Sequence, residues 1–328
     1  MRADERLGPL ASPPVRVCLM IEGQEGVTWD DWRALASACE EHGYEGLFRS
    51  DHYGTLMAPR QRGSLDAWTT LGALAAITSR IRLGTLVSPS TFRHPSVLAK
   101  SAATVDRVSG GRVELGIGAG WNEAEHSSYG FPFPDLRTRM DVLAEQVEIV
   151  ARSFEEEPFS FSGEHYTLED LDAQPKPVQR PRLPLLLGGR AGPKALRLAA
   201  RWADEYNTFG ASIDEVRERR EAFAAAWDRA GRDPDAFRFS AMVGVLVGAD
   251  EADLAQRADR LAAQLGQDAA TVVDSMRSRG VYGTPEQAAE QLRALERAGV
   301  HRVMLQHFLH DDLDSVELIG RELIPLVS

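Results

Sequence analysis

The chain has 328 residues, a formal net charge of −12 at pH 7 and only two cysteines, Cys18 and Cys39, both within apolar patterns. This length allows one large α/β domain or two ordinary ones, and the core needs no disulfide or metal. The acidic balance argues against nucleic acid and against an anionic membrane surface as partners. Residues 1–14 lack the apolar core of a signal peptide, and no apolar run reaches membrane-spanning length. We therefore expect a cytoplasmic protein with buried free thiols, an N-terminal tail over residues 1–14 and one domain over residues 15–328.

Short apolar runs alternate with segments of helical periodicity along the whole chain. The expected strands are 15–21, 46–49, 81–87, 113–117, 185–187, 205–209, 237–247 and 303–308. The expected helices are 28–42, 66–79, 95–108, 137–154, 193–202, a segment ending near 230, 251–279, 284–299 and a last one from 314. Eight strands alternating with helical connections predict a closed (β/α)8 TIM barrel of the α/β class. An open doubly wound sheet is the alternative.

Two segments carry more detailed expectations. The dipeptide Ser88-Pro89 should end the third strand, since proline has no N–H to donate. The helix that follows should present one face made of Val97, Leu98, Ser101, Val105 and Val108. Residues 158–184 break the alternation with an aromatic hairpin and five prolines. We expect this segment to be an insertion outside the barrel that covers the active-site mouth.

The pair Asp51-His52 follows the second strand, and barrel enzymes keep their chemistry at the carboxyl ends of the strands. An imidazole there can give or take a proton near neutral pH, and a neighbouring carboxylate can fix its tautomer. The competing interpretation is structural, with Asp51 capping the next turn and His52 a satisfied polar residue. His307, at the end of the last strand, is the other histidine of interest, and no metal-ligand spacing occurs, so no metal is expected.

Two glycine-rich segments also follow strands. The loop from Gly188 to Gly192 precedes a helix starting at Pro193, which offers backbone amides for a phosphate, or is an ordinary strand-to-helix turn. Gly116, Gly118 and Gly120 lack the spacing of a dinucleotide fingerprint and suggest instead that a flat group approaches the backbone. The following Trp121-Asn122-Glu123 would line the mouth of a pocket or cap the next helix.

Several motifs occur in order: LGTLVSPSTFRHP, DRVSGGRVELGIGAGWNEAEHSSYGFPFP, FSGEHYTL, PKPVQRPRLPLLLGG and LAARWADEYN. Together they resemble the luciferase-like monooxygenase superfamily, and more narrowly its branch of oxidoreductases that use the deazaflavin coenzyme F420. The resemblance runs from residue 15 to residue 327, nearly the whole chain.

The resemblance implies a TIM barrel with a flavin or deazaflavin at the carboxyl ends of the strands. It places a non-proline cis peptide at Leu86-Val87, with Ser88 adjacent, and implies that these three residues lie beside the ring and bind the cofactor. It also implies cofactor-binding roles for Asp51 and a catalytic role for His52, which would flank the ring. Further residues implied to line the ring are Gly118, Ala119, Gly120 and Asn122, and the phosphate would be held by Gly189, Arg190, Ala191 and Gly192. Relatives often form homodimers.

The ending Ser50-Asp51-His52-Tyr53 is closer to the deazaflavin branch than the Glu-His-His of many flavin-using relatives. Sugar-phosphate oxidation is disfavoured, because Trp121 and Leu56 fall near positions where such enzymes have an acidic residue and a tryptophan. A deazaflavin carries hydride and does not activate oxygen. The resemblance thus implies hydride transfer between coenzyme F420 and a small-molecule substrate. The alternatives are a monooxygenase using reduced FMN and oxygen, and a catalytically silent flavin-binding barrel.

Overall fold

Eight parallel strands close into a barrel in the computed structural model, which describes residues 14–57, 62–155, 157–233 and 236–328. The expected tail, apart from residue 14, lies outside these ranges. The barrel strands are β1 (Arg16–Ile21), β2 (Gly46–Arg49), β3 (Arg82–Thr85), β5 (Val113–Gly118), β8 (Leu185–Gly188), β9 (Glu205–Phe209), β10 (Arg238–Val247) and β12 (Arg302–His307). Because β12 pairs with β1 as well as with β10, the sheet has no open edge. The (β/α)8 barrel is confirmed and the open doubly wound sheet is wrong.

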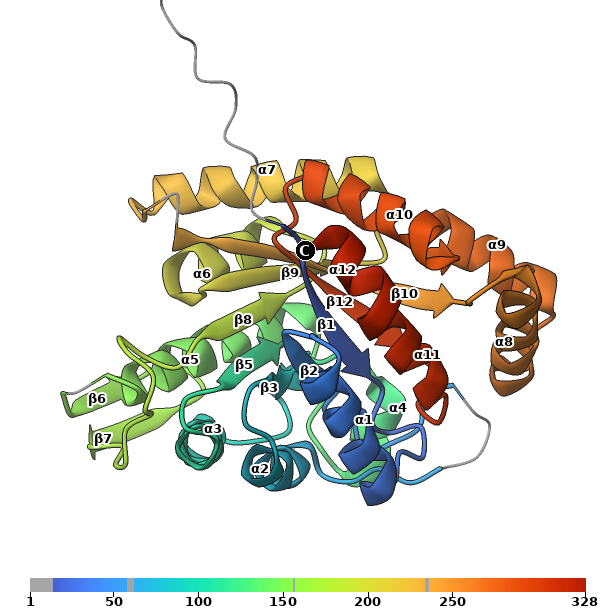
Figure 1. The fold of residues 1–328 in the computed structure, drawn as a ribbon. Helices are drawn as coiled ribbons and strands as arrows, with labels where there is room; N and C mark the ends of the chain where they lie inside the picture. Colours follow the sequence, from blue (N-terminus) through green and yellow to red (C-terminus); the bar gives the residue numbers. More distant parts are fainter. Residues whose placement is uncertain (1–13, 58–61, 156, 234–235) are drawn as a thin grey trace, which may run out of the picture.

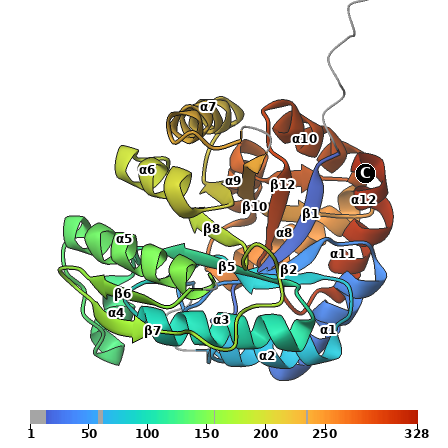
Figure 2. The ribbon, with the colours of Figure 1, turned by 90° about the vertical axis from the view of Figure 1, so that its left-hand side faces the viewer.

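A ring of helices surrounds the strands, as Figure 2 shows from the side of the hairpin β6–β7. The helices are α1 (Trp29–Glu41), α2 (Ala67–Ile77), α3 (Pro95–Ser109), α4 (Glu123–Tyr129), α5 (Leu136–Ser153), α6 (Pro193–Trp202), α7 (Ile213–Arg229), α8 (Glu251–Leu265), α9 (Ala269–Arg279), α10 (Pro285–Arg297), α11 (Leu313–Leu318), the π-helical η2 (Ile319–Leu323) and α12 (Ile324–Val327). A short strand that the sequence did not predict, β11 (Val281–Gly283), extends the sheet beside β10. None of the described helices is long and apolar enough to cross a bilayer.

Apolar side chains form two layers, one inside the barrel and one between barrel and helices. The inner layer contains Cys18, Met20, Phe48, Leu86, Leu186 and Met304. The larger outer layer includes Cys39, and both cysteines are buried free thiols, as predicted. In α3 the predicted face is wrong in part: Leu98 and Val105 are buried, but Val97 and Val108 are more than half exposed. Alanines fill the inner face of α3 instead, at Ala99, Ala102 and Ala103.

The third strand does not end at Ser88-Pro89. A cis peptide joins Leu86 to Val87, as the resemblance implied, and the chain resumes as β4 (Ser88–Pro89), which pairs with β5. The lack of a proline N–H is no obstacle, because Ser90 makes the next hydrogen bond through its N–H to Gly118. The third strand thus ends at Thr85, earlier than expected, and the pairing that resumes in β4 ends at Pro89.

The insertion is real, but its predicted position over the mouth is wrong. Its hairpin, β6 (Phe159–Ser162) and β7 (Thr167–Leu171), lies outside the barrel against α5, where the Glu145 carboxylate accepts the N–H groups of 164–166 (Figure 1). Further along, Gln179 contacts Arg82, the first residue of β3, and the carbonyl of Val113, the first of β5. The segment joins the end of α5 to the start of β8, and such connections lie at the amino-terminal end of a barrel, opposite the mouth.

Candidate active site

His52 follows β2 and is held by Glu125 from α4. The two side chains meet through His52 Nδ1 and Glu125 Oε2, 2.7 Å apart, and both are largely withdrawn from water, with side-chain exposures of 11% and 1%. Because Nδ1 is occupied by Glu125, Nε2 is the ring nitrogen of His52 that can bond to another group. No protein partner of Nε2 occurs in the described ranges. The pair satisfies the geometry of a general acid or base oriented by a carboxylate.

Glu125 is fixed by the backbone around it. Asn122 caps α4, its side chain accepting the N–H of Glu125, so the carboxylate stands in the first turn of that helix. Its other oxygen, Oε1, accepts the backbone N–H groups of Tyr53 and Gly54. These bonds tie the loop after β2 to the loop after β5. Asn122, implied to line a cofactor, therefore has the helix-capping role that the sequence left open.

The charges of this pair reinforce one another. Burial lowers the pKa of His52, but the hydrogen bond and negative charge of Glu125 outweigh it and raise that pKa above its ordinary value. Burial likewise raises the pKa of Glu125, and His52 together with the Gly54 and Tyr53 amides reverses this into a net lowering. Both shifts favour a proton on Nδ1 of the imidazole and an ionised carboxylate.

Asp51 lies beneath this pair in a separate network. Its carboxylate accepts from Ser88 Oγ at 2.6 Å and from both terminal nitrogens of Arg93, at 2.5 and 3.1 Å. Arg93 also reaches Asp66 at 2.8 Å, and Ser88 accepts the indole N–H of Trp68. Asp51 is 1% exposed, so it ties β2 to β4 and orders the backbone that carries His52. The geometry favours this positioning role.

A third polar group stands in the centre of the barrel mouth. Glu22, directly after β1, accepts from Gln24 at 2.9 Å and from the side chain of Gln306 on β12. Gln24 in turn accepts the Ser50 hydroxyl at 2.5 Å. Sequence analysis missed Glu22, Gln24, Gln306 and Glu125. Applying the strand-end rule to β1 and β12 would have found Glu22 and Gln306. Glu125 lies seven residues beyond its strand, and nothing in the sequence pairs it with His52.

The glycines at the carboxyl end of β5, and Gly120 just after it, make room for the chain itself. A Cβ on Gly116 would stand 2.1 Å from the Thr85 carbonyl oxygen, and one on Gly118 would stand 2.6 Å from Val87 Cγ2. Gly120 has φ +74°, with Thr91 close by. The predicted close approach is thus made by the bulged segment around Leu86-Val87, which places Val87 against Gly118. Ala119 is half-buried and packs on the outer core layer.

The loop of Gly189, Arg190, Ala191 and Gly192 offers the features of an oxyanion site. Gly192 caps α6 with no side chain, so the first turn of that helix keeps its amides unblocked. The Gly189 N–H bonds to Asn207 and that of Ala191, at φ 57°, to the Tyr206 hydroxyl, whereas the amides of Arg190 and Gly192 bond to no described residue. These residues fit a phosphate at a helix N-terminus.

Aromatic side chains stand beside His52. Trp121 meets the imidazole edge-on with ring centroids 5.9 Å apart and is 65% exposed. Tyr53 packs on Phe92, Tyr129 and Phe131 at 5.2 to 5.8 Å. The Trp121 ring thus offers an apolar face to a bound molecule.

His307 does not join this group. Met304 belongs to the inner layer and residues alternate along a strand, so Gln306 points into the barrel and His307 away from it. Burial lowers the pKa of His307 to about 4. No cluster of three or more potential metal ligands occurs within the described residues.

Two relatives are similar to this chain in sequence. It is 35% identical over 215 residues to an uncharacterized protein of Mycobacterium tuberculosis, covering 61% of this chain and 74% of that one. It is 28% identical to an FMNH2-dependent dimethylsulfone monooxygenase of Pseudomonas putida, over 93% of this chain and 90% of that one.

Solved structures share the fold. An F420-dependent secondary alcohol dehydrogenase, in complex with an F420–acetone adduct, superposes with a TM-score of 0.82 at 22% identity, covering 96% of this chain and all of that one. The EDTA monooxygenase of Chelativorans sp. BNC1 gives 0.79 at 16% identity, over 96% and 94%. The model of the luciferase-like monooxygenase family matches residues 15–302, and the chain belongs to that family of oxidoreductases and monooxygenases.

Proposed function

We propose that the protein is an oxidoreductase that transfers a hydride between coenzyme F420 and an organic substrate, with His52 as its acid or base. The observation that carries this proposal is the His52–Glu125 pair at the carboxyl ends of the strands. A deazaflavin would supply the hydride donor or acceptor. The backbone N–H groups of Arg190 and Gly192, together with the Arg190 side chain, would hold its phosphate at the start of α6.

In this proposal His52, oriented by Glu125, transfers the proton that accompanies the hydride. With Nδ1–H donated to Glu125, neutral His52 presents a lone pair at Nε2, which can take a proton from a substrate hydroxyl as hydride leaves the adjoining carbon. The resulting imidazolium is stabilised by the Glu125 carboxylate at 2.7 Å and returns the proton in the reverse direction. The raised pKa of His52 favours the protonated form, which suits proton donation to a carbonyl that is being reduced.

The test is anaerobic single turnover with reduced coenzyme F420 and substrates taken from a carbonyl screen. We expect His52→Ala to lower turnover about a hundredfold or more while changing the dissociation constant for the cofactor little. The reason is that the imidazole would transfer a proton to or from the substrate and would not contact the cofactor phosphate. Turnover unchanged by His52→Ala would remove the histidine from the mechanism.

The second candidate is a monooxygenase that uses reduced FMN and oxygen. It is favoured by the dimethylsulfone monooxygenase, the relative that matches this chain over 93% of its length. Parallel binding titrations with coenzyme F420 and FMN separate the candidates. Tight binding of FMN alone, with turnover that stops when oxygen is removed, would establish the monooxygenase and reject the deazaflavin proposal.

A further inference from the structure

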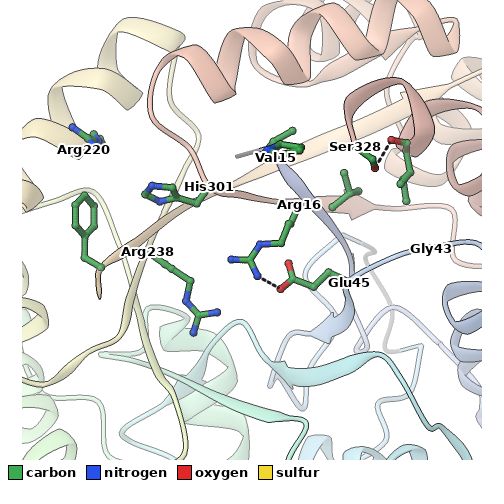
Figure 3. A pocket seen from close by; sticks show the side chains of 12 residues that line it. Val15, Arg16, Gly43, Glu45, Arg220, Arg238, His301 and Ser328 are labelled. Atoms are coloured by element: carbon green, nitrogen blue, oxygen red, sulfur yellow. Dashed lines mark hydrogen bonds and ion pairs between the residues drawn. The ribbon is translucent and has the colours of Figure 1, made fainter. Parts of the chain in front are cut away.

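A cavity of about 780 Å³ lies at the opposite end of the barrel from His52. Its wall includes the first residues of two barrel strands, Arg16 of β1 and Arg238 of β10. Arg220 of α7 and His301, just before β12, complete one side, as Figure 3 shows. Volumes of about 300–1,000 Å³ are typical of small-molecule sites. The family's chemistry at the mouth does not use this end of the molecule.

Next to the cavity lies a buried ionic cluster. Arg302, fully buried, contacts Glu114 and Glu205 at 2.5 Å each. Arg238 adds only long contacts, 4.0 Å to Glu114 and 3.8 Å to Glu205. Arg16 pairs with Glu45 at 2.8 Å and keeps a side-chain exposure of 49%. The three glutamates thus already pair with arginines. Arg238 and Arg16 still have N–H groups that can donate to a further acceptor.

Arg220 is the member of this group without an acidic partner. No ion pair or hydrogen bond to its guanidinium occurs in the described part of the chain, and its Nε is buried without an acceptor. It packs near the ring of Phe237, 5.4 Å from the ring centroid to the guanidinium carbon. A half-buried guanidinium in this state lacks the acceptors that normally offset the loss of water.

His301 adds a neutral donor beside Arg220. Its Nδ1 accepts the backbone N–H of Phe239 at 2.9 Å, so in the neutral ring Nε2 carries the proton. Burial and the positive charge of Arg220 lower the pKa of His301, which keeps the ring neutral at pH 7. Figure 3 shows His301 and Arg220 on the same side of the cavity.

The charges around the cavity do not balance. The positive side chains number five (Arg16, Arg82, Arg220, Arg238, Arg302) and the negative ones three (Glu45, Glu114, Glu205), which leaves two positive charges. Ser328 also lines the cavity, and it pairs with none of these arginines among the described residues. This local excess occurs in a chain whose net charge is −12.

We propose that this cavity binds a small organic oxyanion, a carboxylate or phosphate ester, held by Arg220 and the Nε2–H of His301 with Arg16 and Arg238 nearby. Arginine offers a planar fork that matches both anions, and the histidine supplies a donor without further charge. A metal ion does not suit a wall rich in arginine, and an apolar ligand would leave Arg220 without acceptors. The volume exceeds that of inorganic phosphate, so the natural ligand carries an organic part.

The test uses the full-length protein and two probes, inorganic phosphate and citrate, titrated by isothermal calorimetry at constant ionic strength set with chloride. We expect saturable binding of at least one probe, weakened about tenfold or more by Arg220→Gln. The matched control is Arg217→Gln on the same helix, because Arg217 is exposed and already paired with Asp214 at 2.8 Å. His301→Gln is a second variant, which keeps an acceptor for Phe239 and should also weaken binding.

The cofactor loop is a second place where phosphate could bind, and Gly192→Asp separates the two sites. Binding that survives Gly192→Asp and is weakened by Arg220→Gln supports the amino-terminal site, whatever becomes of the proposed function. Three results would overturn the proposal: no saturable binding, equal binding by the Arg220→Gln and Arg217→Gln proteins, or binding abolished by Gly192→Asp alone. Binding that appears only after residues 1–13 are removed would also overturn it, since the natural occupant would then be the chain itself.

Discussion

Replacing Glu125 by glutamine tests the central pair of the mouth without reference to any cofactor. Glutamine has the same shape, and its side-chain oxygen can still accept the N–H groups of Tyr53 and Gly54 that now reach Oε1. The change therefore removes the negative charge beside His52 while leaving the loop bonded. We expect the pKa of His52 to fall below its ordinary value of 6.5, because burial then acts against only the weaker attraction of Glu22 and Asp51.

The size of this shift follows from the geometry. The Nδ1–Oε2 distance of 2.7 Å and the near-complete burial of Glu125 make this a charge-assisted hydrogen bond. Such bonds contribute about 1.5–3 kcal/mol net, and one pKa unit corresponds to about 1.4 kcal/mol. The pKa of His52 should therefore drop by roughly one to two units in Glu125→Gln relative to the unmodified protein.

The assay is NMR titration of the His52 ring, compared between the unmodified protein, Glu125→Gln and the control Glu123→Gln. Glu123 lies in the same turn of α4 but is exposed, so its replacement should leave the His52 pKa unchanged. The reasoning would be refuted if His52 titrated at the same pH in all three proteins, or if both variants moved it equally.

The pair also predicts how stability depends on pH. The pKa of His52 is raised on folding, so its contribution is complete below pH 6.5 and is lost as pH rises through the higher folded value. The pKa of Glu125 is lowered on folding, so its contribution is present above pH 4.5 and is lost as pH falls through the lower folded value. The stability difference between the unmodified protein and Glu125→Gln should be largest between pH 4.5 and 6.5.

Three further substitutions test other parts of the site. Gly192→Asp should weaken cofactor binding about tenfold or more in a fluorescence titration, because it places a carboxylate at the proposed phosphate site; unchanged affinity in the folded variant would reject that site. Arg93→Met should cost about 3–5 kcal/mol in chemical denaturation, since Asp51 would be left buried without its cation; a loss below about 1 kcal/mol would contradict this. Gly116→Ala should destabilise by about 3 kcal/mol, because its Cβ would meet the Thr85 carbonyl oxygen at 2.1 Å, whereas Gly192→Ala, with open space around it, should be nearly neutral in the same measurement.

Most of the architecture could be predicted because each barrel strand is a short buried run with its own turn signals. The helix ends were also readable: Thr28 caps α1 as expected, and Gly110, at φ 70°, ends α3. The cis peptide at Leu86-Val87 came from the resemblance alone, and β4 was missed because proline was taken as a stop. The position of residues 158–184 was predicted wrongly because the aromatic residues suggested a cover for the mouth. The segment connects a helix to the next strand, and this order places it at the amino-terminal end of the barrel.

The site was only half predictable from sequence. His52 follows a strand directly, so its position at the mouth was expected, and its partner Glu125 was not. Glu125 reaches the histidine through an unpredicted short helix and a contact between residues 73 positions apart, which no local pattern encodes. Asp51 was expected to flank the cofactor ring together with His52. Neighbouring side chains point in opposite directions here, and the Asp51 carboxylate points toward Ser88 and Arg93.

The two ends of this barrel differ in how completely the named charged side chains are paired. At the mouth, the buried carboxylate of Asp51 pairs with Arg93 and that of Glu125 with the imidazole of His52. At the amino-terminal end the matching is incomplete, and Arg220 has no carboxylate among the described residues. The guanidinium of Arg220 gains only its contact with the Phe237 ring, and a ligand that supplied acceptors would add hydrogen bonds that the described residues do not make. The anion site and the catalytic pair thus rest on the same reasoning, in which a charge withdrawn from water is stabilised by the group that faces it.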